Sequence, residues 1–127
     1  MQIEKLDHVN LRTAQLDAMI AWYRDILGLR RGERPDFGFG GAWMYAGDTA
    51  AVHLVEVDGA PGAGSELSLK LEHFAFTASG VPEAFAARLT ETATPFRRSE
   101  SQETGLIAFN IRDPDGNHIH VDFANAG

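Results

Sequence analysis

The stretch Leu6-Asp7-His8-Val9 returns 65 positions later as Leu71-Glu72-His73-Phe74. A second match, between Val52-His53-Leu54 and Ile119-His120-Val121, has an offset of 67 positions. One shift of two residues therefore aligns the two halves of the chain, with turns, apolar segments and histidines in agreement. Repetition at a fixed offset is typical of a structural unit that occurs more than once. The sequence therefore predicts two copies of one unit.

Both halves have the same predicted order of elements. Alternation of apolar and polar residues predicts strands, and apolar residues at helical spacing predict one helix in each half. The predicted elements are a strand (3–12; 69–77), a helix (16–27; 82–92) and three further strands (29–33, 42–46 and 50–57; 96–100, 106–112 and 117–124). This order predicts an α+β fold of two tandem βαβββ modules, whose mixed sheets form an open cup.

A segment rich in glycine, alanine and proline lies between the two halves. We expect a single domain over residues 1–127, with modules over about 1–58 and about 67–127 and a linker over about 59–66. The linker need not separate two domains, because each half alone would expose one face of its sheet.

The composition limits the classes of function. Hydrophobic residues make up 44% of the 127 residues, which is enough for a buried core, and the formal charge is −7. That charge disfavours nucleic acid and anionic membranes as partners. The chain has no cysteine, no long apolar run and no start typical of a secretory signal. We therefore expect a cytoplasmic protein.

Strand periodicity predicts where the histidine side chains lie. Side chains two positions apart on a strand share a face, so His8 should share its face with Asn10 and Arg12. By the same rule, His73 should share its face with Thr77. The more apolar row of each strand should pack under the helix, which leaves the histidine row on the open face of the sheet.

Four of the five histidines occupy strands that the repeat makes equivalent. They are His8, His53, His73 and His120. A lone histidine on a strand is more often structural than a ligand, but two matched pairs favour a site for a divalent metal. The fifth, His118, lies next to a turn and is predicted to be a surface residue, with a supporting role behind the ligands as the alternative.

Three further stretches carry a resemblance to a known family. They are AWYRDILGL at 21–29, LEHFAF at 71–76 and DPDGNHIH at 113–120. Together with residues 6–9 they resemble the vicinal oxygen chelate superfamily, which includes glyoxalase I, extradiol dioxygenases, fosfomycin-resistance enzymes and bleomycin-resistance proteins. The resemblance covers nearly the whole chain.

The resemblance implies which residues hold a metal. Members of this superfamily typically have a ligand on the first and the fourth strand of each half. Here these positions are His8, His53, His73 and His120, which would be both the metal ligands and the catalytic residues. The ion would be Zn, Ni, Fe, Mn or Co. The sequence departs from the commonest pattern at His120, where glutamate is usual, and glyoxalase I tends to have glutamate at the position of His53.

The resemblance also implies an activity. The expected protein is a metal-dependent lyase, isomerase or dioxygenase, whose ion chelates oxygens of a small substrate and stabilises an oxyanion. A protein that binds a small molecule or an antibiotic without turnover is the alternative. A structural or regulatory protein that has kept only the fold is a third possibility. The unpaired surfaces of so small a domain favour a homodimer.

Other residues are predicted to complete the site. The predicted substrate-binding residues are Asn10, Arg12, Trp43, Thr77 and Phe109. Asp122 could act as a base. The pairs Arg30-Arg31 and Arg97-Arg98 are predicted to be solvated edge charges rather than anion-binding groups. The loop over residues 37–41 is interpreted either as a lid or as a plain surface turn with two anchoring rings.

Overall fold

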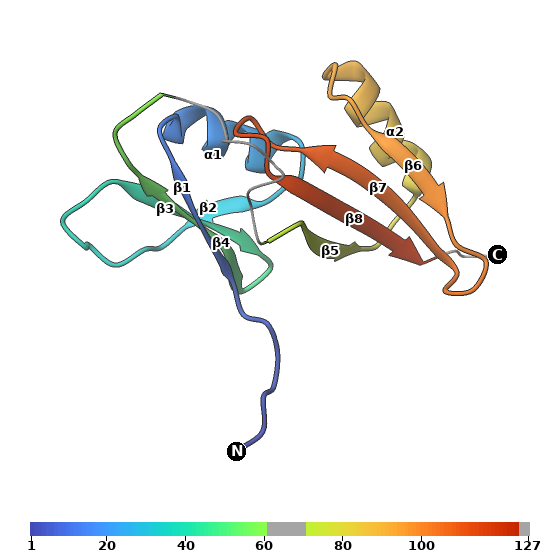
Figure 1. The fold of residues 1–127 in the computed structure, drawn as a ribbon, viewed down its shortest axis with the longest axis horizontal. Helices are drawn as coiled ribbons and strands as arrows, with labels where there is room; N and C mark the ends of the chain where they lie inside the picture. The colour runs from blue at the N-terminus through green and yellow to red at the C-terminus, as the bar shows by residue number, and fades with distance from the viewer. Residues whose placement is uncertain (61–70, 125–127) are drawn as a thin grey trace. The chain divides into compact units, whose positions relative to one another are not determined.

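The computed structural model describes residues 1–60 and 71–124 (Figure 1). The chain divides into two compact units, Met1–Gly62 and Ala63–Gly127. The predicted linker lies mostly outside the described residues.

The first unit has one helix and a sheet of four strands. In chain order its elements are β1 (Val9–Thr13), α1 (Leu16–Asp25), β2 (Arg30–Gly32), β3 (Gly41–Ala46) and β4 (Thr49–Glu56). The strand order in the sheet is β1-β4-β3-β2. The sheet is mixed, because β1 pairs with β4 in parallel while the other pairs are antiparallel.

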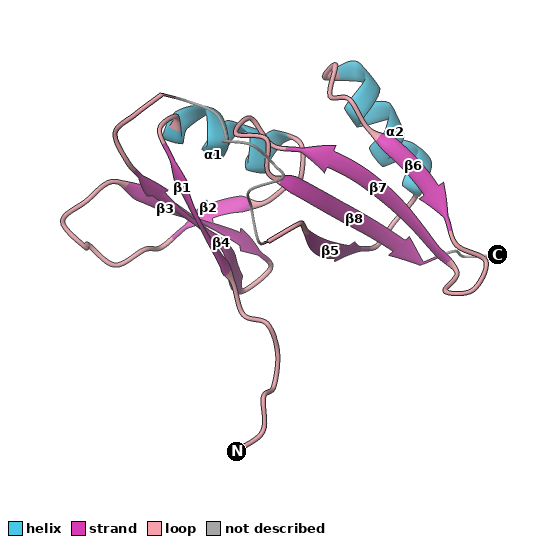
Figure 2. Ribbon diagram, viewed as in Figure 1, coloured by secondary structure: helices cyan, strands magenta, loops and turns pink. Residues whose placement is uncertain are grey.

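The second unit repeats this arrangement. Its elements are β5 (Phe74–Ala78), α2 (Pro82–Glu91), β6 (Arg97–Glu100), β7 (Leu106–Arg112) and β8 (His118–Ala124). The strand order is β5-β8-β7-β6, again with one parallel pair, β5 with β8 (Figure 2). The prediction of an α+β fold with two tandem βαβββ modules and mixed sheets is confirmed, and neither four-stranded sheet is closed.

Each helix packs against one face of the sheet in its own unit. In the first unit Tyr23 and Met19 of α1 are fully buried, as are Met44, Val52 and Leu54 of the sheet. Burial of such side chains contributes roughly 1.5–3 kcal/mol each, so this layer is the main source of stability. The helix therefore covers one face of each sheet, and only the opposite face can hold a site that a ligand reaches.

The core of the second unit is aromatic. Phe85 of α2 packs edge-on against Phe109 of β7, with ring centroids 5.1 Å apart, and Phe123 of β8 lies 5.8 Å from Phe109. Phe109 is fully buried. This cluster fixes which side chains of β7 and β8 point away from the helix.

The first strand of each unit begins later than the alternation predicts. The prediction of a strand from residue 3 is wrong, since β1 begins at Val9. The apolar side chains before it do not join the core, because Ile3 and Leu6 remain 75% and 82% exposed. In Figure 1 this N-terminal segment runs away from the sheet of its unit. In the second unit β5 begins at Phe74, and the first two residues of the predicted strand lie outside the described residues. His8 and His73 consequently lie just before their strands.

Among residues 1–60 and 71–124, no helix has the length and apolar character needed to span a membrane.

Candidate metal centre

His53 is the central histidine of the first unit. It lies on β4 opposite Trp43 of β3 and Asn10 of β1, so these three side chains share the face that points away from α1. The ring of His8 stacks on the ring of His53 with centroids 3.8 Å apart and an interplanar angle of 10°. Trp43 stacks on the other side at 4.0 Å. His53 is therefore held between two flat rings and is only 8% exposed.

The second unit has the equivalent pair. His120 of β8 lies opposite Asn110 of β7 and Ala75 of β5. The ring of His73 stacks on the ring of His120 at 3.9 Å with an interplanar angle of 8°. The two pairs therefore have nearly the same geometry, as the repeat predicts.

His118 joins the pair of the second unit. It lies two residues before His120 on β8 and so has the same face, with its ring centroid 4.8 Å from that of His120 and 5.3 Å from that of His73. One nitrogen from each of the three rings lies within 4.8 Å of the others. His118 is half-buried, so the prediction that it is a plain surface residue is wrong. The strand begins at this residue and turns its side chain onto the histidine face.

A carboxylate contacts the outer histidine of each pair. Oδ2 of Asp7 lies 2.7 Å from Nδ1 of His8, and Glu72 makes the equivalent contact with Nδ1 of His73. An ionised carboxylate can only accept, so Nδ1 carries the hydrogen and Nε2 keeps its lone pair for a metal. Metal-bound histidines are usually oriented in this way. The repeat alignment places Asp7 and Glu72 at equivalent positions, each directly before a histidine. This pairing is the feature of the sequence from which their orienting role could have been predicted.

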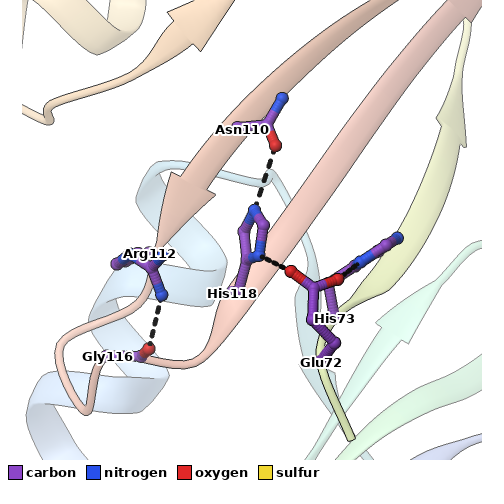
Figure 3. A network of polar contacts seen from close by, with 6 residues as sticks. All are labelled: Glu72, His73, Asn110, Arg112, Gly116 and His118. Atoms are coloured by element: carbon purple, nitrogen blue, oxygen red, sulfur yellow. Dashed lines mark hydrogen bonds and ion pairs between the residues drawn. The ribbon is translucent and has the colours of Figure 1, made fainter. Parts of the chain in front are cut away.

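Glu72 also links the third histidine to the pair (Figure 3). Its Oε1 lies 3.0 Å from Nδ1 of His118, and Nε2 of His118 lies 3.0 Å from the side-chain oxygen of Asn110. The hydrogen bond from His73 is the main reason that the pKa of Glu72 falls below its ordinary value, and the bond from His118 adds to it. The hydrogen bond from His8 lowers the pKa of Asp7 in the same way. Both side chains are therefore ionised at neutral pH.

The inner histidines are held in the neutral form. Burial lowers the pKa of His53, and repulsion from His8 lowers it further. Burial also lowers the pKa of His120, with added repulsion from His73 and His118. A metal competes with protons for imidazole, so a lowered pKa keeps these ligands available at pH 7.

A sequence model of the Glyoxalase/Bleomycin resistance protein/Dioxygenase superfamily matches residues 5–121. The matched range includes all five histidines. The chain belongs to this superfamily. The resemblance recognised in the sequence is thereby confirmed. Among curated proteins, no match to this member of the superfamily was found.

Solved structures of the superfamily share the fold. A glyoxylase/bleomycin resistance protein/dioxygenase domain from Frankia sp. EAN1pec is 21% identical with a TM-score of 0.80, and the match covers 99% of this chain and 96% of that one. A lactoylglutathione lyase from Agrobacterium tumefaciens is 22% identical with a TM-score of 0.70, over 98% and 97% of the two chains. The genomically encoded fosfomycin resistance protein of Listeria monocytogenes is 12% identical with a TM-score of 0.73, over 98% and 97%.

Within this superfamily fold, four of the predicted substrate-binding residues lie on a histidine face. Asn10 and Arg12 of β1 are exposed on the face of His53, and Trp43 stacks on that ring. Thr77 of β5 is exposed on the face of His120. Their contact with a substrate stays a prediction.

The prediction for Phe109 is wrong. Its ring is fully buried against α2, on the opposite face of the sheet from His120. The neighbouring Asn110 takes the position on the histidine face that was expected for Phe109. Phe109 alternates with Ile107 and Ile111, which are also buried, so the apolar row of β7 lies on the helix side and the other row lies on the histidine face.

Asp122 is an acidic side chain on the same face as His120. It lies two residues after His120 on β8 and opposite Thr77 of β5. Its Oδ1 is buried and has no hydrogen-bond partner among the described residues. A buried carboxylate oxygen without a donor is costly unless a ligand, a proton or an ion satisfies it.

Of the predicted metal ligands, the structure brings His8 together with His53 in the first unit and His73 together with His120 in the second. It adds His118 to the pair of the second unit.

Proposed function

We propose that this protein is a metal-dependent enzyme that acts on a small, oxygen-rich substrate. The residues proposed to hold the divalent ion are His8, His53, His73 and His120. The observation that carries the proposal is the repeated set of a carboxylate, an outer histidine and an inner histidine stacked on it, with ring separations of 3.8 and 3.9 Å. A histidine that only fills a core needs no carboxylate to orient its ring, whereas a metal-bound histidine usually has such a partner.

The chemistry of the donor set fits a borderline divalent metal. Imidazole nitrogens suit Zn, Ni and Fe, and Mn and Co belong to the same proposal. When bound, the ion supplies Lewis acidity toward two substrate oxygens and stabilises the oxyanion that develops on them. Asp7 and Glu72 orient the outer histidines, and burial lowers the pKa of His53 and His120 and so keeps these two ligands neutral.

Side chains beside the histidines are proposed to position the substrate. Asn10, Arg12 and Thr77 offer polar groups on the histidine faces, and Trp43 offers a flat apolar wall. Asp122 is proposed to act as a base toward the substrate. These roles are common to a lyase, an isomerase and a dioxygenase. The proposal includes a cytoplasmic homodimer.

A second function is favoured by one feature of the first unit. Phe37 and Phe39 stack at 5.5 Å, and both stay about half exposed, at 48% and 52%. The guanidinium of Arg34 lies over both rings, and Phe37 contacts Trp43 at 6.3 Å. Exposed stacked rings are suited to bind a flat ligand. The alternative is therefore a protein that binds a small molecule or an antibiotic without turnover.

Metal analysis separates the two functions. The protein as purified should hold tightly bound metal, and His73→Ala should lose it while remaining folded by circular dichroism. Glu103→Gln, an exposed carboxylate in a turn, is the control and should keep the metal. Metal-free protein that binds drug-like aromatic ligands as well as the purified protein does would favour the second function.

A further inference from the structure

The two neighbouring arginines of β6 have different surroundings. Arg98 lies on the helix side, where its Nη2 donates to Glu83 at 2.9 Å and its guanidinium lies 5.5 Å from the ring of Phe109. Arg97 lies opposite Asn110, which in turn lies opposite His120, so Arg97 is on the histidine face. The sequence predicted that both arginines are solvated charges at the edge of the sheet. In the structure their side chains lie on opposite faces of β6.

Arg97 borders an open groove of about 400 Å³ in the second unit. Arg112, Asn110 and His118 also line it, with Pro95 and Phe96 at one side. No acidic side chain is among the lining residues in the described part of the unit. The groove therefore presents two guanidinium groups in a protein whose net charge is −7.

The two guanidinium groups are held differently. Nη1 of Arg112 donates to the carbonyl of Gly116 at 3.3 Å, which keeps this side chain over the β7–β8 turn (Figure 3). Arg97 is exposed, and within residues 1–60 and 71–124 it has no ion-pair or hydrogen-bond partner. A guanidinium has five N–H donors in a fork that matches an oxyanion. The donors of Arg97 are therefore available to a ligand in the groove.

The groove is continuous with the histidine cluster. His118 lines the groove, and its ring contacts both Asn110 and Glu72. Arg97 and His120 lie on strands that flank β7, so their Cα atoms are about 10 Å apart. A small molecule with polar groups a few bonds apart can span this distance.

We propose that this groove binds the anionic group of the substrate, a planar carboxylate or a tetrahedral oxyanion, through Arg97 and Arg112. The substrate is then a small organic acid whose other oxygens face the histidines. This inference rests on the proposed function for the metal, but the anion site itself requires no metal.

The test titrates inorganic phosphate and, separately, acetate into the full chain, with binding followed by NMR chemical shifts. Arg97→Gln should weaken binding at least about tenfold, because it removes a charged hydrogen-bonding group. Arg98→Gln, on the same strand but the opposite face, is the matched control and should leave affinity unchanged. Arg30→Gln, the repeat-equivalent arginine of β2, is a second control. Tighter binding of phosphate would indicate a site for a tetrahedral group, and tighter binding of acetate a site for a planar carboxylate.

The same titrations in the His73→Ala background separate the two proposals. Anion binding that survives loss of the metal and still depends on Arg97 supports the groove, whether or not the enzyme proposal holds. Absence of binding by both probes overturns the inference, and so does an equal loss in Arg97→Gln and Arg98→Gln. Metal content measured on the same samples reports on the proposed function alone.

Discussion

Glu72 contacts two histidines, whereas Asp7, its counterpart in the first unit, contacts one. Glu72→Gln should therefore lower metal affinity by roughly 10–100-fold relative to wild type. Asp7→Asn should lower it less. The amide keeps the size of the side chain but loses the charge that orients His73 and His118. Competition with a chromogenic chelator measures the affinity. Equal, small effects of both variants would show that the carboxylates do not orient ligands.

His53 gives a prediction about acid stability in protein stripped of metal. Burial lowers the pKa of His53 from 6.5, and the unfolded chain returns it to that value. Between the two values the unfolded state binds more protons, so the free energy of unfolding rises with pH. This contribution is complete above pH 6.5 and is lost as the pH falls through the folded pKa. Urea unfolding between pH 5 and 8 should show a shallower dependence for His53→Leu than for wild type.

His120 has the same lowered pKa and should retain its share of that dependence in the variant. Identical pH profiles for wild type and His53→Leu would contradict the assignment of His53 as a buried neutral ring. The profile of the variant should remain sloped, since one of the two inner histidines is still present.

Residue-level reasoning from the sequence located the histidine faces because strand alternation is a fixed geometric rule. Phe109 was placed in the site without that rule, although it alternates with Ile107 and Ile111 in the buried row of β7. His118 was assigned to the surface because the turn before it dominates the local sequence. Its position is set by contacts with Glu72 and Asn110, which are 46 and 8 residues away in the chain.

At the scale of elements, the β7–β8 turn fixes the start of the strand that carries two histidines. Asp113 is 4% exposed, and its Oδ1 accepts from the backbone N–H groups of Asp115 and Asn117 at 3.0 and 2.9 Å. Gly116 supplies the positive φ of 85° that the turn requires. The sequence predicted this turn correctly, because proline, aspartate and glycine at these positions each favour it.

Asp113→Ala should therefore weaken both stability and metal binding. The buried N–H groups would lose their acceptor, at a cost of about 1–3 kcal/mol in the free energy of unfolding. Urea denaturation measures this change. Asp48→Ala, in the exposed turn of the first unit, is the control and should change stability little. A comparable loss in both variants would show that the buried hydrogen bonds of Asp113 are not the cause.

The helices were predicted well and the first strands poorly, for a physical reason. Pro82 favours the first turn of α2, and the buried stripe of Phe85 and Leu89 continues the helix, so the predicted range 82–92 agrees closely with Pro82–Glu91. A strand also needs a partner for its backbone and a core for its apolar row. The residues before Val9 alternate in sequence, but their apolar side chains remain exposed.

At the scale of the whole molecule, the proposed metal set requires residues of both units. Each unit contains a matched pair of histidines, and in the second unit His118 lies next to that pair. Two arrangements therefore compete, one ion held by all four repeat-equivalent histidines or an ion held by His73, His118 and His120 alone. Their donor sets differ in whether the first unit is needed, and this difference can be measured on the full chain.

The double variant His8→Ala/His53→Ala decides between them. If four histidines hold one ion, the variant should lose metal as completely as His73→Ala/His120→Ala, because two imidazoles alone bind a divalent ion weakly. Elemental analysis after dialysis against a weak chelator measures the loss, and circular dichroism confirms that both variants are folded. His118→Ala is the informative control, since it should retain metal in the four-histidine arrangement. Metal that stays bound to His8→Ala/His53→Ala but is lost from His118→Ala would instead assign the ion to the three histidines of the second unit.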